Sequence, residues 1–255
     1  MFSWKQPQTR PIIVAHRGAS AVAPENTLAA FSRAIDAGAD AIELDVRLTR
    51  DGEIVVFHDS HLQRTTNGRG KVEEHSLADL RRLSAGAWFH RSFSSEMIPT
   101  LEEVLELLRG RTGLNIEIKT IPLRRNRIGI VERCSSMIQQ YHAESYVLVS
   151  SFHHQHVNLT KRILPVVMTG ILIHPLKHIG RSAFQAAHKE KADFIILGGG
   201  ALRKNVVGKA HERRLEVGEF TVNTRRRFER ALRYNVDAIF TDDPGRMIRL
   251  RSEMK

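Results

Sequence analysis

Short runs of apolar, often β-branched residues alternate with amphipathic segments along nearly the whole chain. Leu28, Phe31 and Ile35 form the apolar stripe of the first amphipathic segment, at the spacing of one helix face. Strand-and-helix alternation of this kind predicts a parallel sheet with helices packed on it. The expected strands span residues 12–15, 41–47, 53–58, 114–119, 146–150, 166–173, 194–197, 216–222 and 238–241.

This alternation gives about eight strand–helix units, the number found in a (β/α)8 barrel. The chain has 255 residues, and such a barrel typically takes about 250. Its hydrophobic content of 42% is ordinary for a globular domain with a proper core. We therefore predict a single α/β domain over residues 1–255, a (β/α)8 TIM barrel. An open, doubly wound sheet is the alternative.

Residues 60–98 do not follow this alternation. They contain Gly68, Gly70 and Gly86 among polar turns, with one short helix expected at 77–83. We interpret the segment as an insertion that covers the C-terminal mouth of the barrel. Trp88 and Phe89 are expected either to form its small core or to provide an apolar wall for the leaving group of a substrate.

Two helix starts carry recognisable sequence signals. Thr100 and Glu103 have the spacing of a capping box at the start of a helix. Asn26 is expected to cap the helix that covers residues 26–37. Glu25, just before it, is a candidate for binding a substrate hydroxyl at the mouth of the barrel.

The formal net charge is +11, and much of it is clustered. Such a charge attracts nucleic acid, anionic lipid head groups or phosphorylated substrates. Because no helix-turn-helix, zinc finger or aromatic-plus-basic RNA pattern accompanies it, we expect no nucleic-acid partner. We interpret most of the charge as solvated surface, with peripheral contact to anionic lipid left open. The clusters lie at 124–127, 213–214, 225–227 and 246–251.

The chain shows neither a signal peptide nor an apolar run of the ~18 residues that a spanning helix needs. Its one cysteine, Cys134, cannot form an internal disulfide, which favours a reducing compartment. We expect a soluble, cytoplasmic monomer or homodimer without stable membrane insertion. Cys134 is expected to be a small buried residue on a helix.

Acidic side chains stand near the ends of two expected strands. Glu43 and Asp45 are two residues apart, as are Glu117 and Lys119, so each pair projects from one face of its strand. Like carboxylates placed together repel one another, and a divalent cation removes that penalty. Three acidic oxygen ligands suit Mg²⁺ or Ca²⁺. The alternative is that each carboxylate pairs with a nearby arginine or lysine.

Two histidines end neighbouring strands and are expected at the same rim. His16 follows the first strand, and His58 follows the short strand after the acidic pair. A phosphodiester needs one group to deprotonate the nucleophile and another to protonate the leaving alkoxide, and two histidines meet that need near neutral pH. Arg17 offers a planar fork for phosphate oxygens, and Lys119 a point charge for the transition state.

Taken in order, these segments resemble the glycerophosphodiester phosphodiesterase family. The resemblance covers most of the chain and is densest from His16 to Lys119. The similar stretches are His-Arg-Gly at 16–18, Pro-Glu-Asn-Thr at 24–27, Glu-Leu-Asp-Val at 43–46, and those at 51–59, 98–103 and 115–119. The resemblance implies a (β/α)8 barrel with an insertion after the second βα region.

The resemblance also implies a reaction and a site. The reaction is hydrolysis of a small-molecule glycerophosphodiester to sn-glycerol 3-phosphate and an alcohol. The implied metal ligands are Glu43, Asp45 and Glu117. The implied catalytic residues are His16 and His58, as acid and base, together with Lys119, and Arg17 and Lys119 are implied on the phosphate.

The chain departs from the family pattern where specificity for the alcohol is expected. Phe220 stands where family members usually carry a tryptophan, and Glu219 makes the approach to it polar. The run Gly198–Gly200 is also unusual, either as phosphate-cradling amides or as a flexible loop. A lysophospholipase D-type hydrolase is the alternative activity, because the basic charge and the insertion would suit a substrate presented by a membrane. The alternative outside the enzymes is a catalytically silent barrel that binds phosphorylated ligands or nucleic acid.

Overall fold

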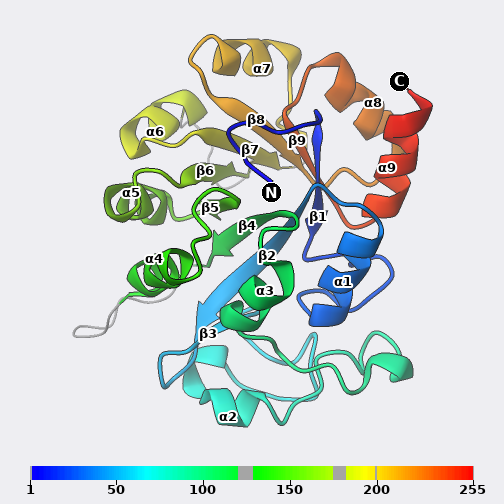
Figure 1. The fold of residues 1–255 in the computed structure, drawn as a ribbon, viewed down its shortest axis with the longest axis vertical. Helices are drawn as coiled ribbons and strands as arrows, with labels where there is room; N and C mark the ends of the chain where they lie inside the picture. Colours follow the sequence, from blue (N-terminus) through cyan, green and yellow to red (C-terminus); the bar gives the residue numbers. More distant parts are fainter. Residues whose placement is uncertain (1, 120–128, 175–181, 199, 255) are drawn as a thin grey trace.

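The computed structural model describes residues 2–119, 129–174, 182–198 and 200–254. Eight parallel strands close into a barrel because β1 pairs with β2 on one side and with β9 on the other. Figure 1 shows the ring of strands with helices around its outside, which confirms the predicted (β/α)8 barrel. The strands are β1 (Ile12–His16), β2 (Ala41–Leu48), β4 (Gly113–Ile118), β5 (Val147–Ser151), β6 (Met168–Ile173), β7 (Phe194–Gly198), β8 (Glu216–Phe220) and β9 (Ala238–Thr241).

Alternate residues of each strand face opposite sides of the sheet. In β1, Ile12 and Val14 belong to the apolar cluster that fills the barrel, together with Phe194 of β7. Ile13 belongs instead to the cluster between the strands and the surrounding helices. The period-two pattern of the sequence therefore decides which side chains can reach the barrel interior.

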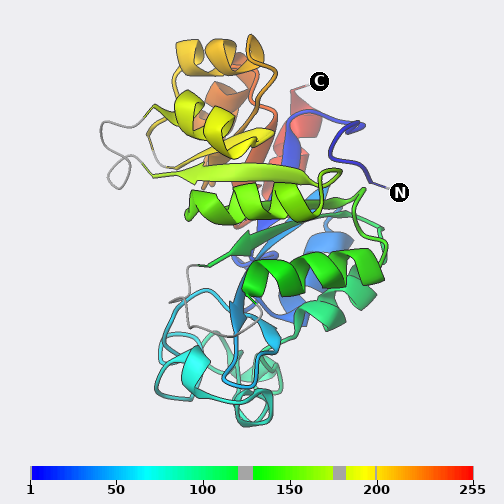
Figure 2. The same ribbon diagram turned by 90° about the vertical axis from the view of Figure 1, so that its left-hand side faces the viewer.

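Trp4 closes the N-terminal end of that interior. Its side chain is buried, and its indole N–H donates a hydrogen bond of 2.9 Å to the carbonyl of Tyr146, the residue just before β5. Its ring also meets the edge of Phe194, the first residue of β7, with 5.9 Å between ring centres. The blue N-terminal segment crosses the ring of strands in the view of Figure 1, and Figure 2 shows it at one end of the barrel.

Eight helices of the described chain surround the barrel. The Thr100–Glu103 capping box is present as predicted. The expectation for Asn26 is wrong, because the hydroxyl of Thr27 accepts the capping hydrogen bond from the N–H of Ala30. The helices are α1 (Leu28–Asp36), α3 (Leu101–Leu108), α4 (Ile130–Gln140), α5 (His154–Ile163), α6 (Ala183–Glu190), α7 (Lys204–His211), α8 (Arg225–Arg233) and α9 (Pro244–Glu253).

The segment at 60–98 follows β3 (Ile54–Val56), which runs antiparallel to β2 after the turn at Gly52. It contains α2 (Leu77–Leu80) and two short 3₁₀ helices, Val72–Glu74 and Arg91–Phe93. Figures 1 and 2 show that it extends away from the barrel on the side of β2 and β3, so only part of it borders the mouth.

This segment has an apolar core of its own, and the expected aromatic pair lies outside it. Trp88 is 42% exposed and packs edge-on against Phe89. The expectation that these two rings form the small core is therefore wrong. Neither ring lines the cavities at the barrel mouth, so the structure does not support an apolar wall for the leaving group there either. The core consists of Val55, Phe57, Leu62, Val72, Leu80, Ala85 and Ile98.

Three aspartates stand immediately before strands at the N-terminal end of the barrel: Asp40, Asp193 and Asp237. One carboxylate oxygen of each accepts a hydrogen bond of 2.8 Å from a main-chain N–H of a neighbouring strand. Each carboxylate is also paired with a cationic or imidazole side chain. These partners are Arg251 for Asp40, Lys161 for Asp193, and Arg10 with His211 for Asp237.

Cys134 lies buried on α4 as expected, and burial raises the pKa of its thiol to about 12, so it stays protonated. Among the described residues, no helix combines the length and apolarity that crossing a bilayer requires. The basic cluster expected at 124–127 falls outside the described residues.

Candidate active site

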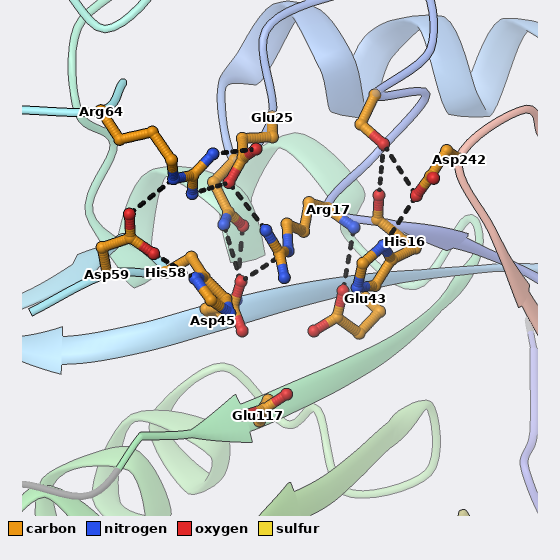
Figure 3. Close-up of polar contacts among 12 residues, drawn as sticks. His16, Arg17, Glu25, Glu43, Asp45, His58, Asp59, Arg64, Glu117 and Asp242 are labelled. Atoms are coloured by element: carbon orange, nitrogen blue, oxygen red, sulfur yellow. Dashed lines mark hydrogen bonds and ion pairs between the residues drawn. The ribbon is translucent and has the colours of Figure 1, made fainter. Parts of the chain in front are cut away.

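Three acidic side chains meet at the C-terminal end of the barrel. Glu43 and Asp45 project from β2, and Asp45 is the register partner of Glu117 on β4. All three are buried, and their carboxylate oxygens lie within 4.8 Å of one another. Figure 3 shows that two adjacent strands supply the three side chains. The structure thus brings together the three predicted ligands.

Glu43 is the least compensated of these carboxylates. Its Oε2 accepts a hydrogen bond of 2.9 Å from the main-chain N–H of Arg17. Its Oε1 is buried and has no hydrogen-bond partner among the described residues. Burial and the neighbouring charge of Asp45 raise the pKa of Glu43 to about 8. A charged Glu43 at neutral pH therefore needs a further positive group.

Asp45 has the opposite electrostatic surroundings. Burial alone would raise its pKa, but the charges of Lys119 and Arg17 outweigh burial and lower it. Lys119 Nζ lies 2.8 Å from its Oδ1, and the side-chain amide of Asn26 donates to its Oδ2 at 2.8 Å. Lys119 also pairs with Glu117, whose pKa burial nonetheless raises. The predicted alternative, pairing with cations, therefore occurs but leaves Glu43 out.

Arg17 stands on a sharp turn after β1. Arg17 and Gly18 both have positive φ, of 59° and 83°. A Cβ on Gly18 would lie 2.7 Å from atoms of Ala30, so only glycine lets the turn pack this closely against α1. The turn aims the N–H of Arg17 at Glu43, and its guanidinium reaches Asp45 and Glu25 at 3.3 and 2.9 Å.

His16 is the last residue of β1. Its Nδ1 lies 2.7 Å from Oδ1 of Asp242, so Nδ1–H donates to that carboxylate and Nε2 is left for other partners. The side-chain amide of Asn223 donates to the other oxygen of Asp242, and Ser20 Oγ donates to Oδ1 at 3.3 Å. Burial would lower the pKa of His16, but the hydrogen bond to Asp242 and the charge of Glu43 raise it.

His58 follows β3 and is held from two directions. Its Nδ1 lies 2.5 Å from Oδ1 of Asp59, which leaves Nε2 free of that contact. Its carbonyl accepts two hydrogen bonds, of 3.0 and 2.7 Å, from the guanidinium of Arg47 on β2. Burial lowers the pKa of His58. A carboxylate therefore orients each histidine through Nδ1. The electrostatic surroundings differ, because they raise the pKa of His16 and lower that of His58.

Arg64 connects two loops of the site. Its guanidinium donates to both oxygens of Glu25, at 2.8 and 2.7 Å, and to Oδ2 of Asp59 at 2.5 Å. Glu25, predicted as a ligand for a substrate hydroxyl, pairs with Arg64 and Arg17 and also lines the hollow on the His16 side, so that role stays a prediction. Figure 3 shows Arg64 above Asp59 and beside Glu25.

A cavity of about 230 Å³ is lined by two of the three carboxylates, Glu43 and Glu117. Its polar side includes His16, Arg17, His58 and Lys119. Two further hollows adjoin it, one of about 470 Å³ that includes Ser60 and His61, and one of about 450 Å³ on the His16 side. The opposite side of the central cavity is apolar and consists of Phe152, Leu172, Ile196, Phe220 and Phe240.

Comparison with known proteins agrees with this geometry. A sequence model of the Glycerophosphoryl diester phosphodiesterase family matches residues 16–246. The chain belongs to this family. It is 38% identical to a glycerophosphodiester phosphodiesterase of Bacillus altitudinis, over 95% of this chain and 99% of that one.

Solved structures of related proteins have the same fold. A glycerophosphodiester phosphodiesterase from Agrobacterium tumefaciens is 30% identical and aligns with a TM-score of 0.78, covering 91% of this chain and 96% of that one. An Oleispira antarctica phosphodiesterase, solved in complex with the product sn-glycerol-3-phosphate, is 28% identical with a TM-score of 0.84, over 95% and 97% of the two chains. The predicted family and barrel fold are therefore confirmed.

Several polar residues of this family member escaped the sequence analysis. Asp242, which orients His16, follows β9 and is 226 residues away in sequence. Arg64 and Arg47 were not distinguishable from the many other arginines. Asn26 was assigned to a helix cap, because its positive φ of 58° and its contact with Asp45 appear only in the structure. Asp59 adjoins His58 and could have been noticed.

The structure shows where the three departures from the family pattern lie. Phe220 faces the central cavity and meets Phe152 edge-on, so it lies on the predicted substrate side. Glu219 does not, because it faces α8 and pairs with Arg227 and Arg230. The ring of Phe220 lies within 2.7 Å of where a Cβ on Gly198 would stand, so Gly198 is needed for packing. Gly199 falls outside the described residues.

Proposed function

We propose that this protein hydrolyses glycerophosphodiesters to sn-glycerol 3-phosphate and an alcohol, with His16 and His58 as acid and base. One observation carries the proposal. Both histidines line the same cavity as Glu43, Glu117 and Lys119, and both have Nδ1 engaged by a carboxylate, which leaves Nε2 for a reacting group.

The residues fit a divalent cation, which Glu43, Asp45 and Glu117 would hold. The buried, unpartnered Oε1 of Glu43 and the raised pKa of Glu43 support this assignment. A ligand set of oxygens alone favours Mg²⁺ or Ca²⁺ over zinc. When bound, such an ion supplies Lewis-acid stabilisation of charge on phosphate oxygens.

The chain's own groups divide the remaining work. Nε2 of one histidine accepts the proton of the attacking hydroxyl, and Nε2 of the other donates a proton to the leaving alkoxide. Arg17 and Lys119 line the cavity, where their charges stabilise the phosphate as negative charge builds on it. Because Asp242 and Asp59 fix the rings, neither histidine must reorient before it exchanges a proton.

The substrate assignment is supported by the two-sided cavity. Glycerol carries hydroxyls along one edge and a carbon chain along the other, which suits a polar side facing an apolar wall that includes Phe220 and Phe152. The product complex of the Oleispira relative supports the same assignment. The glycerophosphoryl half is then the recognised part, and the alcohol lies toward an adjoining hollow.

Release of glycerol 3-phosphate from a panel of diesters tests the proposal. Glycerophosphocholine, glycerophosphoethanolamine and glycerophosphoglycerol should be cleaved, whereas bis(p-nitrophenyl) phosphate, which lacks glycerol, should be a poor substrate. EDTA should abolish turnover, and Mg²⁺ or Ca²⁺ should restore it. Full activity in metal-stripped protein would refute the ligand assignment. Cleavage of lysophosphatidylcholine alone would favour the lysophospholipase D-type activity instead.

A further inference from the structure

Arg64 lies at the junction of two otherwise separate parts of the site. It belongs to the segment after β3, and it donates three hydrogen bonds to two carboxylates, Glu25 and Asp59. Glu25 comes from the loop after β1, so one guanidinium joins two loops that are 39 residues apart in sequence. Figure 3 shows this junction as a continuous row of dashed contacts from His58 to Arg17.

Each carboxylate that Arg64 holds contacts one residue of the reaction. The second oxygen of Asp59 engages Nδ1 of His58, and Oε1 of Glu25 also accepts a hydrogen bond of 2.9 Å from Arg17. Arg64 itself lines none of the three cavities described above. Its effect on His58 and Arg17 must therefore pass through Asp59 and Glu25.

Within the described part of the chain, the other histidine has no cationic support of this kind. Asp242, the partner of His16, is held by the neutral side chains of Asn223 and Ser20. Neutral donors are therefore enough to orient a carboxylate beside a histidine. We infer that the charged Arg64 does more than orient Asp59. The planar guanidinium can donate to Glu25 and Asp59 together only when the two carboxylates lie in a narrow range of relative positions. Arg64 therefore fixes the position of His58 relative to Arg17.

A purely stabilising role does not explain this residue well. The side chain of Arg64 is 44% exposed, so water screens part of its attraction to Glu25 and Asp59. Burial would raise the pKa of Asp59, but its hydrogen bonds to Arg64 and His58 lower it to about 2, so Asp59 stays an acceptor for Nδ1–H over the whole neutral range.

We propose that Arg64 is a positioning residue that sets the ring of His58 through Asp59 and the guanidinium of Arg17 through Glu25. The proposal rests on the function proposed above, in which His58 transfers a proton and Arg17 binds the phosphate. It predicts that loss of Arg64 frees Asp59 to rotate. His58 then populates both neutral tautomers instead of the one with the proton on Nδ1.

The test compares Arg64→Gln with Arg69→Gln, which removes the same charge from an exposed side chain of the same segment. At saturating Mg²⁺, Arg64→Gln should lower kcat by about 10–100-fold, the usual range for partners that orient a functional residue, while Arg69→Gln should match the wild type. Arg64→Lys, which keeps the charge but loses the fork, should lie between them. Equal kcat values for Arg64→Gln and Arg69→Gln would overturn the proposal.

A double-substitution cycle tests the route through Asp59. In an Asp59→Asn background, Arg64→Gln should lower kcat little further, because the group through which it acts is already lost. In a Glu25→Gln background, Arg64→Gln should raise KM little further. Full multiplication of the single effects in both backgrounds would mean that Arg64 acts by another route and would overturn the proposal.

A measurement that does not need turnover separates this proposal from the function on which it rests. The ¹⁵N shifts of labelled histidine, with His58 identified from a His58→Gln sample, report which ring nitrogen carries the proton at a fixed pH of 8. The wild type should show the Nδ1–H tautomer and Arg64→Gln a mixture. An unchanged tautomer would overturn the positioning role. Absence of diesterase activity with a changed tautomer would count against the proposed function alone.

Discussion

A set of three acidic residues at each end of the barrel allows a comparison, because the two sets have different surroundings. At the N-terminal end, Asp40, Asp193 and Asp237 lie apart, each bound to a main-chain N–H and to a basic side chain. At the C-terminal end, Glu43, Asp45 and Glu117 have carboxylate oxygens within 4.8 Å of one another, and one buried oxygen of Glu43 has no hydrogen-bond partner in the described part of the chain. The first set joins strands to helices, whereas the second concentrates negative charge that Lys119 and Arg17 balance only in part.

The comparison separates stability from function on physical grounds. A buried carboxylate that is hydrogen-bonded and paired costs little to keep, whereas an unpaired one costs several kcal/mol or stays protonated. The site carboxylates therefore hold free energy that binding of a cation would release. Conservative substitutions at the two ends should consequently have opposite effects on stability and activity.

Histidine substitutions should show the largest contrast. His16→Ala or His58→Ala should lower kcat by ~10²–10⁴ with folding intact, because each removes a positioned acid or base. The combined loss should be less than the product of the two, since they act as a unit. His211→Ala, at the N-terminal end, should instead leave kcat unchanged and lower the melting temperature, because it removes a partner of Asp237. Near-wild-type kcat in His58→Ala would break the comparison.

Metal affinity should depend strongly on pH. The pKa of Glu43 is raised to about 8 in the metal-free site, so below that pH a bound cation must displace a proton. Apparent affinity for Mg²⁺ should therefore rise by up to about tenfold per pH unit between pH 6 and 8 and level off above. Isothermal titration calorimetry in two buffers of different ionisation enthalpy measures both the affinity and the released proton. Binding independent of pH would contradict the electrostatic contrast between the two ends.

Removal of a single charge should move folding stability in opposite directions. Glu43 has a folded pKa raised above its unfolded value. The unfolded chain therefore loses the Glu43 proton first, and stability falls as pH rises from about 4.5 to about 8. In EDTA, Glu43→Gln should therefore be more stable than wild type by ~1 kcal/mol at pH 8, with a smaller gain at pH 5.

Asp40→Asn is the matched substitution at the other end. It weakens the ion pair with Arg251 and should lower stability by ~1–3 kcal/mol while leaving kcat unchanged. Urea unfolding at both pH values, with and without chelator, measures these differences. Destabilisation of similar size by both substitutions would show that the two ends are not distinct.

Arginine-to-lysine substitutions should show the smallest effect. Arg17→Lys keeps the charge but loses the fork that reaches Asp45 and Glu25, so it should slow cleavage of all three glycerophosphodiesters by a similar factor of ~10. Arg251→Lys should change only stability. The three head groups should differ in rate by about tenfold at most, ~1.4 kcal/mol. A strong preference for one alcohol, unchanged by Arg17→Lys, would place specificity near Phe220 or the adjoining hollows.

Sequence reasoning was most successful where local pattern decides structure. Period-two alternation predicted that Glu43 and Asp45 share a face, and the order of strands and helices predicted the barrel. It failed where an interaction depends on ring closure or loop geometry. Asp242 reaches His16 only because β9 pairs with β1. Arg64 reaches Glu25 only because the segment after β3 folds back toward α1.

Some misassignments came from reading residue type without direction. Glu219 was placed on the substrate side because it precedes Phe220, yet neighbouring residues of a strand point to opposite faces, and it pairs with α8. Trp88 was expected in a small core because it is large and apolar, although it is 42% exposed. Neither error touched the residues of the site, whose spacing along the strands was sufficient.

The position of Trp4 has a consequence for substrate entry and product release. This ring covers the N-terminal end, and the side chains of Ile12, Val14 and Phe194 fill the space behind it. The cavity over the site is therefore reached from the C-terminal end of the barrel. Substrate and products therefore enter and leave at that end. Glycerol 3-phosphate has to leave before the next diester can enter, so it should inhibit competitively, and its departure sets an upper limit on the turnover rate.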